Sequence, residues 1–288
     1  MRRSRSPPRP EAILTVAAML RQLPGGLPGD QGRRRSYAFR RADGALEMAL
    51  ADAVNEAGDT PDAVSRALLA SLAELAGERP GRAAVDALCV ADRQFLMRAL
   101  AAHLGHQGGW FDATCMHCAS PFDFRLDPTG LPVKEAGDAF PLARLVLDDK
   151  PLTLRVPCGA DQIRVLREPV EQRREALLRG LEVPDPESGS ALPDQLTQEH
   201  IAHCEAALEA QAPEITREVA ACCPECGQVN SVGIDPYAVL AHNPAGLLAE
   251  VHRLAWHYHW SEADILALPR GRRKNYLALI DAARGMTG

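Results

Sequence analysis

Apolar residues recur every three or four positions over long stretches of the chain, which is the spacing of amphipathic helices. The pattern predicts a short strand from Tyr37 and then helices at about 44–57, 60–77 and 90–104. The third stretch is the clearest, because Leu96 and Leu100 continue an apolar stripe and Gly105 follows where a left-handed C-cap belongs. We therefore expect a helical region over residues 36–108 with nothing catalytic in it.

Alternating apolar positions replace the helical spacing in the middle of the chain. Residues 142–147 and 152–156 alternate on either side of a polar turn, which predicts a β-hairpin. Helices are expected at about 161–167, 170–179 and 197–210. A stretch rich in Pro, Asp, Ser and Gly over 183–194 predicts an exposed loop before the last helix. Together these elements indicate an αβ subdomain inserted at about 127–215.

Helix start signals are strongest near the C-terminus. Asn243 followed by proline predicts an N-cap with proline at the first helical position. Ser261 with Asp264 three residues later predicts the cap of a second helix. A third helix is expected over 270–283, so we predict a three-helix unit within residues 238–288.

Composition indicates a globular protein with a mixed surface. The chain has 288 residues, 46% of them hydrophobic, and a formal net charge of −6, which disfavours a surface devoted to nucleic acid. No apolar run reaches the length of a bilayer span, and eight cysteines fit a reducing cytoplasm better than a disulfide framework. Residues 1–35 are rich in Arg, Pro and Gly, which predicts a basic, largely disordered arm apart from a short helix at 11–22.

Two Cys-x-x-Cys pairs carry the clearest candidate chemistry. Their members are Cys115, Cys118, Cys223 and Cys226. Each turn presents two thiolates, and two facing turns supply the four tetrahedral sulfurs that Zn²⁺ prefers. Pro224 and Gly227 favour a tight turn, and strand-like runs follow at 121–126 and 228–234. The layout predicts one structural Zn²⁺ in a split zinc ribbon over 109–237. Together with the helices expected above, these strands predict an α+β fold that is mainly helical.

The separation of the two pairs leaves other interpretations open. Residues 119–221 lie between them, where a compact zinc ribbon has about 15 to 20 residues. The inserted subdomain accounts for this length. The alternatives are two unrelated thiol turns, or a redox pair that leaves the second pair unexplained. Cys222 could replace Cys223 as a ligand, but it lacks the two-residue spacing to Cys226.

A catalytic role has little support in the sequence. His203 and Glu205 precede Cys223 in an order that imitates zinc deaminases, but the residue before Cys223 is a cysteine where those enzymes have proline. A four-cysteine site also leaves no open position at which a metal could activate water. No Ser-His-Asp set, phosphate loop or dinucleotide fingerprint is present, so we expect no enzymatic activity.

Aromatic and basic residues gather near the C-terminus and form a candidate partner surface. They are Trp256, Tyr258, Trp260, Arg272 and Arg273. Aromatic side chains anchor protein interfaces, and arginines are common at their rims. Cations at a helix start oppose the helix dipole, which indicates a partner or an acidic neighbour. A solvated basic cluster is the alternative.

The run at 254–269, continuing to 276–280, resembles the C-terminal signature of T4-like phage baseplate proteins, a family also found in phage-tail-like contractile injection systems. Residues 152–162 and 92–96 are similar to the family as well. The resemblance implies a non-enzymatic structural component or assembly chaperone of a contractile-tail baseplate hub.

Such a protein would bind other baseplate or tail proteins in the cytoplasm of a bacterial or phage-infected cell, with incorporation into the finished particle left open. It would have no small-molecule substrate and no membrane span. The second hypothesis is a zinc-ribbon regulator that binds nucleic acid through the N-terminal arm and the basic cluster at 270–274.

Overall fold

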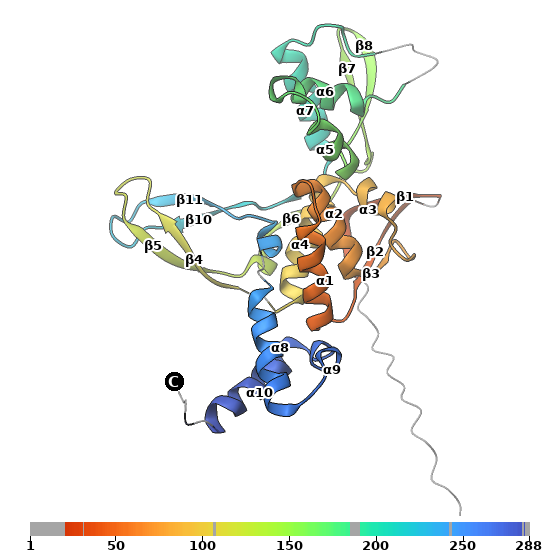
Figure 1. The fold of residues 1–288 in the computed structure, drawn as a ribbon. Coiled ribbons are helices and arrows are strands. Elements are labelled where there is room, and N and C mark those ends of the chain that lie inside the picture. Colours follow the sequence, from red (N-terminus) through yellow and green to blue (C-terminus); the bar gives the residue numbers. More distant parts are fainter. Residues whose placement is uncertain are drawn as a thin grey trace, which may run out of the picture.

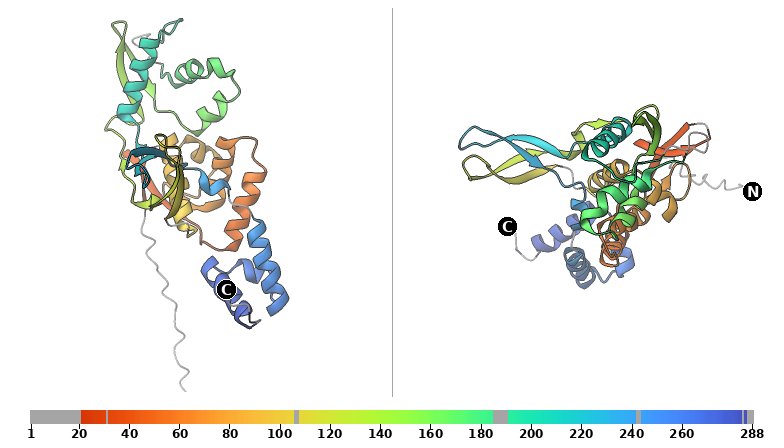
Figure 2. Two further views of the ribbon diagram at one scale, coloured as in Figure 1. Left: turned by 90° about the vertical axis from the view of Figure 1, so that its left-hand side faces the viewer. Right: turned by 90° about the horizontal axis from the view of Figure 1, so that it is seen from above.

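The computed structural model describes residues 21–30, 32–105, 108–184, 191–241, 244–283 and 285. Over these residues the chain is a mixed α/β protein with small antiparallel sheets, as expected in outline from the sequence. The inserted subdomain, a central body and a C-terminal helical unit follow one another in a row, and a narrow arm extends sideways from the body (Figures 1 and 2). The cap at Asn243 and residues 11–20 of the expected N-terminal helix lie outside the described ranges.

The central body combines a small sheet with several helices. Strands β1 (Arg21–Gly29), β2 (Gly32–Phe39) and β3 (Leu72–Leu75) form a three-stranded antiparallel sheet in the order β1-β2-β3. Helices α1 (Gly44–Asn55), α2 (Thr60–Ser71), α3 (Arg82–Ala87) and α4 (Val90–His103) pack with this sheet, as does the short helix η3 (Ala238–Ala241). The helices expected near 44–57 and 90–104 are confirmed.

The helix expected over 60–77 ends early. Leu72 and Leu75 are three residues apart, a spacing that also fits a helix, but here they belong to β3. Register between β2 and β3 shifts at Ala38 and Phe39, and this bulge lets both leucines be buried in the core. Pairing with β2 therefore overrides the local pattern.

Residues 21–29 and 32–35 form strands, which corrects, for these residues, the expectation that 1–35 are largely disordered. β1 and β2 form a hairpin whose Leu23 is fully buried in the core. The backbone N–H groups of Gly25 and Gly26 donate hydrogen bonds of 2.8 and 2.7 Å to the carboxylate of Asp92 in α4. The glycines that suggested disorder allow this close approach, since a Cβ at Gly25 would lie 2.7 Å from an Asp92 oxygen.

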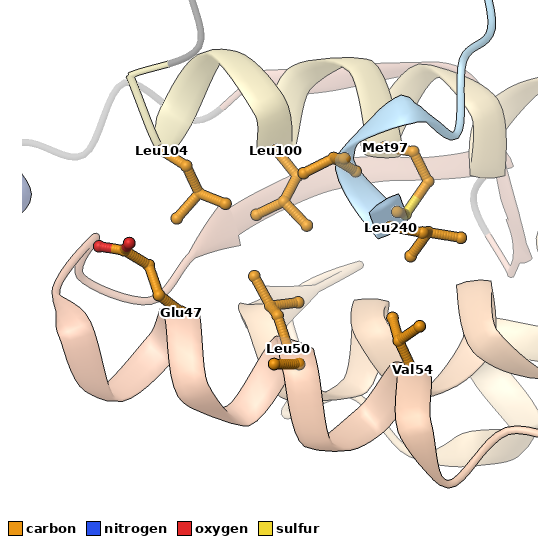
Figure 3. Close-up of a pocket in the computed structure, with 9 residues that line it drawn as sticks. Glu47, Leu50, Val54, Met97, Leu100, Leu104 and Leu240 are labelled. Atoms are coloured by element: carbon orange, nitrogen blue, oxygen red, sulfur yellow. The ribbon is translucent and has the colours of Figure 1, made fainter. Parts of the chain in front are cut away.

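A small gap remains inside the body between α1, α4 and η3 (Figure 3). Its volume of about 10 Å³ is close to the minimum that holds one water molecule. Leu50 and Leu100 line it, and Glu47 lies at one end. It is a packing defect of the core and not a ligand site.

The inserted subdomain has its own core. It contains β7 (Leu142–Leu147), β8 (Lys150–Arg155), α5 (Gly159–Val165), η2 (Val170–Gln172), α6 (Arg173–Leu181) and α7 (Gln198–Gln211). At its root, β6 (Val133–Lys134) pairs with β9 (Glu214–Ile215). The expected hairpin and helices are confirmed, and Asp148 and Asp149 at the turn both have positive φ, which suits a tight hairpin.

The C-terminal unit consists of α8 (Ala245–Tyr258), α9 (Glu262–Leu266) and α10 (Arg270–Ala283), which enclose Leu254, Ile265 and Ile280. The Ser261 hydroxyl accepts a 3.2 Å hydrogen bond from the backbone N–H of Asp264, so the expected cap is confirmed. These helices form a unit that begins after η3 and not at residue 238, because Val239 is buried in the core of the body. No helix among the described residues is long and apolar enough to cross a bilayer.

Candidate metal centre

Two β-hairpins form the arm that projects from the body. One consists of β4 (Gly109–Thr114) and β5 (Pro121–Leu126), and the other of β10 (Glu218–Cys222) and β11 (Val229–Gly233). Each connection between strands carries one Cys-x-x-Cys pair, and the two hairpins lie side by side (Figure 1). Residues more than a hundred positions apart thereby meet in one cluster.

The four cysteines of the two pairs form the cluster. Their Sγ atoms all lie within 4.8 Å of one another. The distance between Sγ atoms is 3.6 Å for Cys115 and Cys226, and 3.7 Å for Cys118 and Cys223. Tetrahedral coordination with Zn–S bonds of about 2.3 Å separates the sulfurs by about 3.8 Å. The prediction that these residues come together is confirmed, and the spacing fits a metal ion of this size.

The first cysteine turn is closed by backbone hydrogen bonds. The N–H of Cys115 donates to the carbonyl oxygen of Ser120, and the N–H of Ala119 donates to the carbonyl oxygen of Cys115, both at 2.9 Å. Ala119 has a φ of 59°, in the left-handed region that an L residue rarely occupies. The sequence did not reveal this position, because alanine carries no turn signal.

The second turn repeats this geometry. The N–H of Cys223 donates to the carbonyl oxygen of Gln228, and the N–H of Gly227 donates to the carbonyl oxygen of Cys223, again at 2.9 Å. Gly227 has a φ of 71°, as its sequence position predicts. Equivalent turns therefore present their sulfurs to each other from two opposed hairpins.

Asn230 joins the two turns, a role that sequence reasoning missed. Its side-chain oxygen accepts a 2.8 Å hydrogen bond from the backbone N–H of Met116 in the first turn. Its side-chain nitrogen donates to the carbonyl oxygen of Gln228 in the second turn at 3.1 Å. The available signal in the sequence was an asparagine within a short strand-like run that also carries Val229 and Val232.

Backbone dipoles favour thiolate at the first turn. Burial raises the pKa of Cys115, but N–H groups of Cys118 and His117 directed at its sulfur outweigh burial and lower this pKa to about 6. Hydrogen bonds from the hydroxyl and N–H of Ser120 lower the pKa of the Cys118 thiol.

The sulfur of Cys226 behaves differently from those of Cys115 and Cys118. The N–H of Gln228 lowers the pKa of Cys226, but burial and hydrogen bonds shared with the other three cysteines raise it to about 12. Four thiolates this close repel one another unless a cation lies between them, so the cluster is a candidate site for a divalent metal ion.

The deaminase-like residues are not part of the metal cluster. Glu205 lies on α7 of the insertion and forms a two-pronged salt bridge with Arg174, with contacts of 2.8 and 2.6 Å. His203 is exposed on the same helix. Cys222 is exposed and is not among the clustered cysteines, so the structure favours Cys223 as the fourth ligand.

The candidate partner surface divides into exposed and enclosed residues. Tyr258 and Trp260 stack at 4.7 Å, and Tyr276 packs edge-on against Trp260 at 4.9 Å, so these rings mainly hold the C-terminal helices together. Trp256, in contrast, is 71% exposed and stacks on His252, which is also exposed. Of the three predicted aromatic residues, Trp256 is the one that the structure leaves open to a partner.

The prediction that Arg273 lies at the rim of an interface is wrong. Its side chain is fully buried and forms salt bridges of 2.7 Å with Glu47 of α1 and 2.9 Å with Glu250 of α8. The acidic neighbours that its place at a helix start suggested belong to this chain itself. Arg272 is exposed and stays a candidate for the rim.

No protein-family model, curated protein or solved structure matches the chain. The likeness to T4-like baseplate proteins therefore gains no support from these comparisons.

Proposed function

We propose that this chain is a non-enzymatic structural protein, stabilised by one Zn²⁺, that binds other proteins as a component or assembly factor of a contractile-tail baseplate hub. The observation that carries the proposal is the four-thiolate cluster at the end of an arm outside the hydrophobic body. The opposed cysteine turns on two hairpins have the layout of a zinc ribbon. All-thiolate tetrahedral sites are typical structural zinc sites.

The ligand set argues against catalysis at the metal. Four protein sulfurs fill a tetrahedral shell, so no position stays open for water or substrate. A redox role for one cysteine pair is also disfavoured, because both pairs lie in one cluster with equivalent turn geometry. The site then serves to hold two hairpins together.

Exposed apolar side chains support a protein partner. Trp110 and Met116 on the arm are 73% and 82% exposed, and Trp256 on α8 is exposed together with Leu248. Leu248, His252 and Trp256 are spaced four residues apart and share one face of the helix. The assignment of that partner to a tail baseplate rests on the resemblance of residues 254–280.

Metal analysis of the purified full-length chain tests the zinc proposal. We expect one Zn²⁺ per chain after purification under reducing conditions without chelators. Loss of zinc in the double variant Cys115→Ser with Cys226→Ser is expected, while Cys222→Ser retains it. Iron in place of zinc, or unchanged metal in the double variant, would contradict the proposal.

Co-purification with the proteins encoded beside this one tests the docking surface. Trp256→Ala is expected to weaken such a complex at least tenfold, since a central tryptophan commonly contributes more than about 1.4 kcal/mol. Leu279→Ala, at another exposed apolar residue of the same unit, is the matched control. The charge test is Arg272→Glu alone, because changing Arg273 would break a buried pair inside the chain.

The structure offers less to the nucleic-acid hypothesis. Arg34 and Arg35 in β2 form salt bridges with Glu78 and Glu135, and Arg273 is buried. These pairs neutralise part of the basic surface that the hypothesis requires. Tight duplex DNA binding at physiological salt, abolished by Arg272→Glu, would nevertheless move the protein to that class.

A further inference from the structure

A cavity of about 390 Å³ lies where the arm joins the body. Its wall combines Arg98 and Ala101 of α4 with Phe111 of β4, and with Ile215, Ile234 and Pro236. The volume falls within the range of about 300–1,000 Å³ that is usual for small-ligand pockets, and most of these side chains are apolar. None of the residues that line the cavity belongs to the cysteine cluster.

Arg98 is the unusual residue of this cavity. It is only 9% exposed, and its Nη1 atom is buried without a hydrogen-bond partner in the described part of the chain. Burial lowers the pKa of its guanidinium. A buried charge without a partner is costly, so native proteins rarely retain one.

Two other buried arginines show what a structural arginine looks like in this molecule. Arg93 donates hydrogen bonds to the carbonyl oxygens of Val85 and Pro61 and to the hydroxyl of Ser65. Arg273 is paired with two carboxylates. The Nε atom of Arg93 is also without a partner, but both of its Nη atoms are bonded. No hydrogen bond of the Arg98 guanidinium is found among the described residues, which indicates a partner from outside the chain.

Other polar side chains around the cavity are already engaged. The hydroxyl of Thr129 donates to the Asp127 carboxylate at 2.7 Å, and the hydroxyl of Thr216 donates to a backbone carbonyl oxygen at 3.0 Å. Asp235 is exposed and accepts a 2.8 Å hydrogen bond from the N–H of Tyr237. Among the lining side chains that the structure describes, the Arg98 guanidinium is thus the hydrogen-bond donor that is left without an acceptor.

We propose that this cavity binds a monocarboxylate with an apolar body, with the carboxylate on the Arg98 guanidinium and the apolar part against Phe111, Ile215 and Ile234. A guanidinium and a carboxylate match in shape and form two parallel hydrogen bonds. Arg98 is the cation among the lining residues and balances a single negative charge, whereas a phosphate dianion would be left uncompensated and would be repelled more strongly by the Asp235 carboxylate, which also lines the cavity. This inference goes beyond the proposed function and holds whether or not the protein belongs to a baseplate.

Titration of the metal-bound full-length chain with phenylacetate, followed by NMR or calorimetry, tests the proposal. We expect saturable binding that phenylacetamide, the neutral analogue, fails to reproduce within a factor of ten in affinity. A short peptide ending in phenylalanine with a free carboxylate is the second arm, and its C-terminal amide is the control. Tighter binding of the peptide acid would identify a polypeptide C-terminus as the source of the carboxylate, and tighter phenylacetate binding would identify a free small acid.

Three variants separate ligand binding from folding. Arg98→Met keeps the apolar stem and is expected to weaken phenylacetate binding at least tenfold. The ligand-free melting temperature should stay equal or rise, because an unpaired buried charge is removed. Arg167→Met, the same change at an exposed arginine of the insertion, is expected to bind normally. Ala101→Phe fills the cavity while keeping the guanidinium, and it is expected to abolish binding if Arg98→Met fails to fold.

Several outcomes would overturn the inference. One is the absence of binding by both phenylacetate and the peptide acid at millimolar concentration. Another is binding of inorganic phosphate in preference to either carboxylate. A third is unchanged phenylacetate affinity in folded Arg98→Met or folded Ala101→Phe.

Discussion

The arm and the inserted subdomain each contain β-hairpins, yet different interactions hold them. In the insertion, the hairpin β7–β8 packs on α6 and α7, and Leu154 and Leu181 are fully buried between them. In the arm, the small buried cluster consists of Phe122, Ala221 and two of the four clustered cysteines. Two-stranded hairpins are marginal alone in water, so the metal ion that we propose at this cluster would supply in the arm the stability that an apolar core supplies in the insertion.

The largest expected effect is the unfolding of the arm when the metal ion is removed. Binding of structural Zn²⁺ contributes about 10–16 kcal/mol in small zinc domains, far more than the arm's apolar contacts. Chelation, or Cys115→Ser with Cys226→Ser, should therefore bring amide hydrogen exchange in β4, β5, β10 and β11 to the rate of unfolded chain. Exchange in α7 should stay slow, and Cys222→Ser serves as the control. Equal loss of protection in arm and insertion would remove the distinction between them.

The reciprocal change is expected to unfold the insertion while the metal stays bound. Leu154→Ala removes a fully buried side chain and should cost about 2–5 kcal/mol. Val146→Ala, at an exposed residue of the same hairpin, should cost less than about 0.5 kcal/mol. Denaturant unfolding gives the free energies, and metal analysis checks retention of zinc. Release of zinc by Leu154→Ala would show that the two regions unfold together.

A smaller effect concerns a carboxylate network in the insertion, centred on Asp161. Asp161 is buried, which raises its pKa, but hydrogen bonds from Arg155 and the N–H of Cys158 outweigh burial and lower it from 3.8 to about 2. A lowered folded-state pKa contributes stability that is present above pH about 4 and is lost as the pH falls towards about 2.

Asp161→Asn should therefore lower stability by about 2 kcal/mol at neutral pH and make little difference at pH about 2. The measurement is the difference in unfolding free energy between variant and wild type at each pH, in which effects of acid on the metal site cancel. Asp149→Asn, in the exposed hairpin turn, is the control. A difference that does not vary with pH would contradict the assigned role of Asp161.

The smallest expected effect lies in the arm. Asn230→Ala removes the hydrogen bond from the Met116 N–H and should cost about 1 kcal/mol, equivalent to roughly a fivefold lower zinc affinity. Ser231→Ala changes the neighbouring exposed residue and is expected to leave zinc affinity unchanged. Competition with a chromogenic chelator measures both. Equal affinities for wild type and Asn230→Ala would show that the cysteine turns need no side-chain link.

Local signals in the sequence were sufficient to identify the four clustered cysteines and most elements. The spacing within each cysteine pair, Gly227 after the second pair and the Ser261 cap each act over a few residues. The hairpin at 142–156 and helix α4 follow from periodicity in the same way. Such features depend on backbone geometry and side-chain direction within one turn or one strand. Both can be predicted from the few residues of that turn or strand.

Tertiary structure decided what depends on distant partners. The segment of β3 has helical spacing in the sequence but pairs with β2 as a strand. Gly25 is held in place because its N–H donates a hydrogen bond to Asp92. The fold pairs the buried Arg273 with Glu47, whereas Arg98 Nη1 has no partner among the described residues. A sequence shows that a residue is polar or apolar, whereas the energy of burying it depends on which groups the fold brings within hydrogen-bond distance.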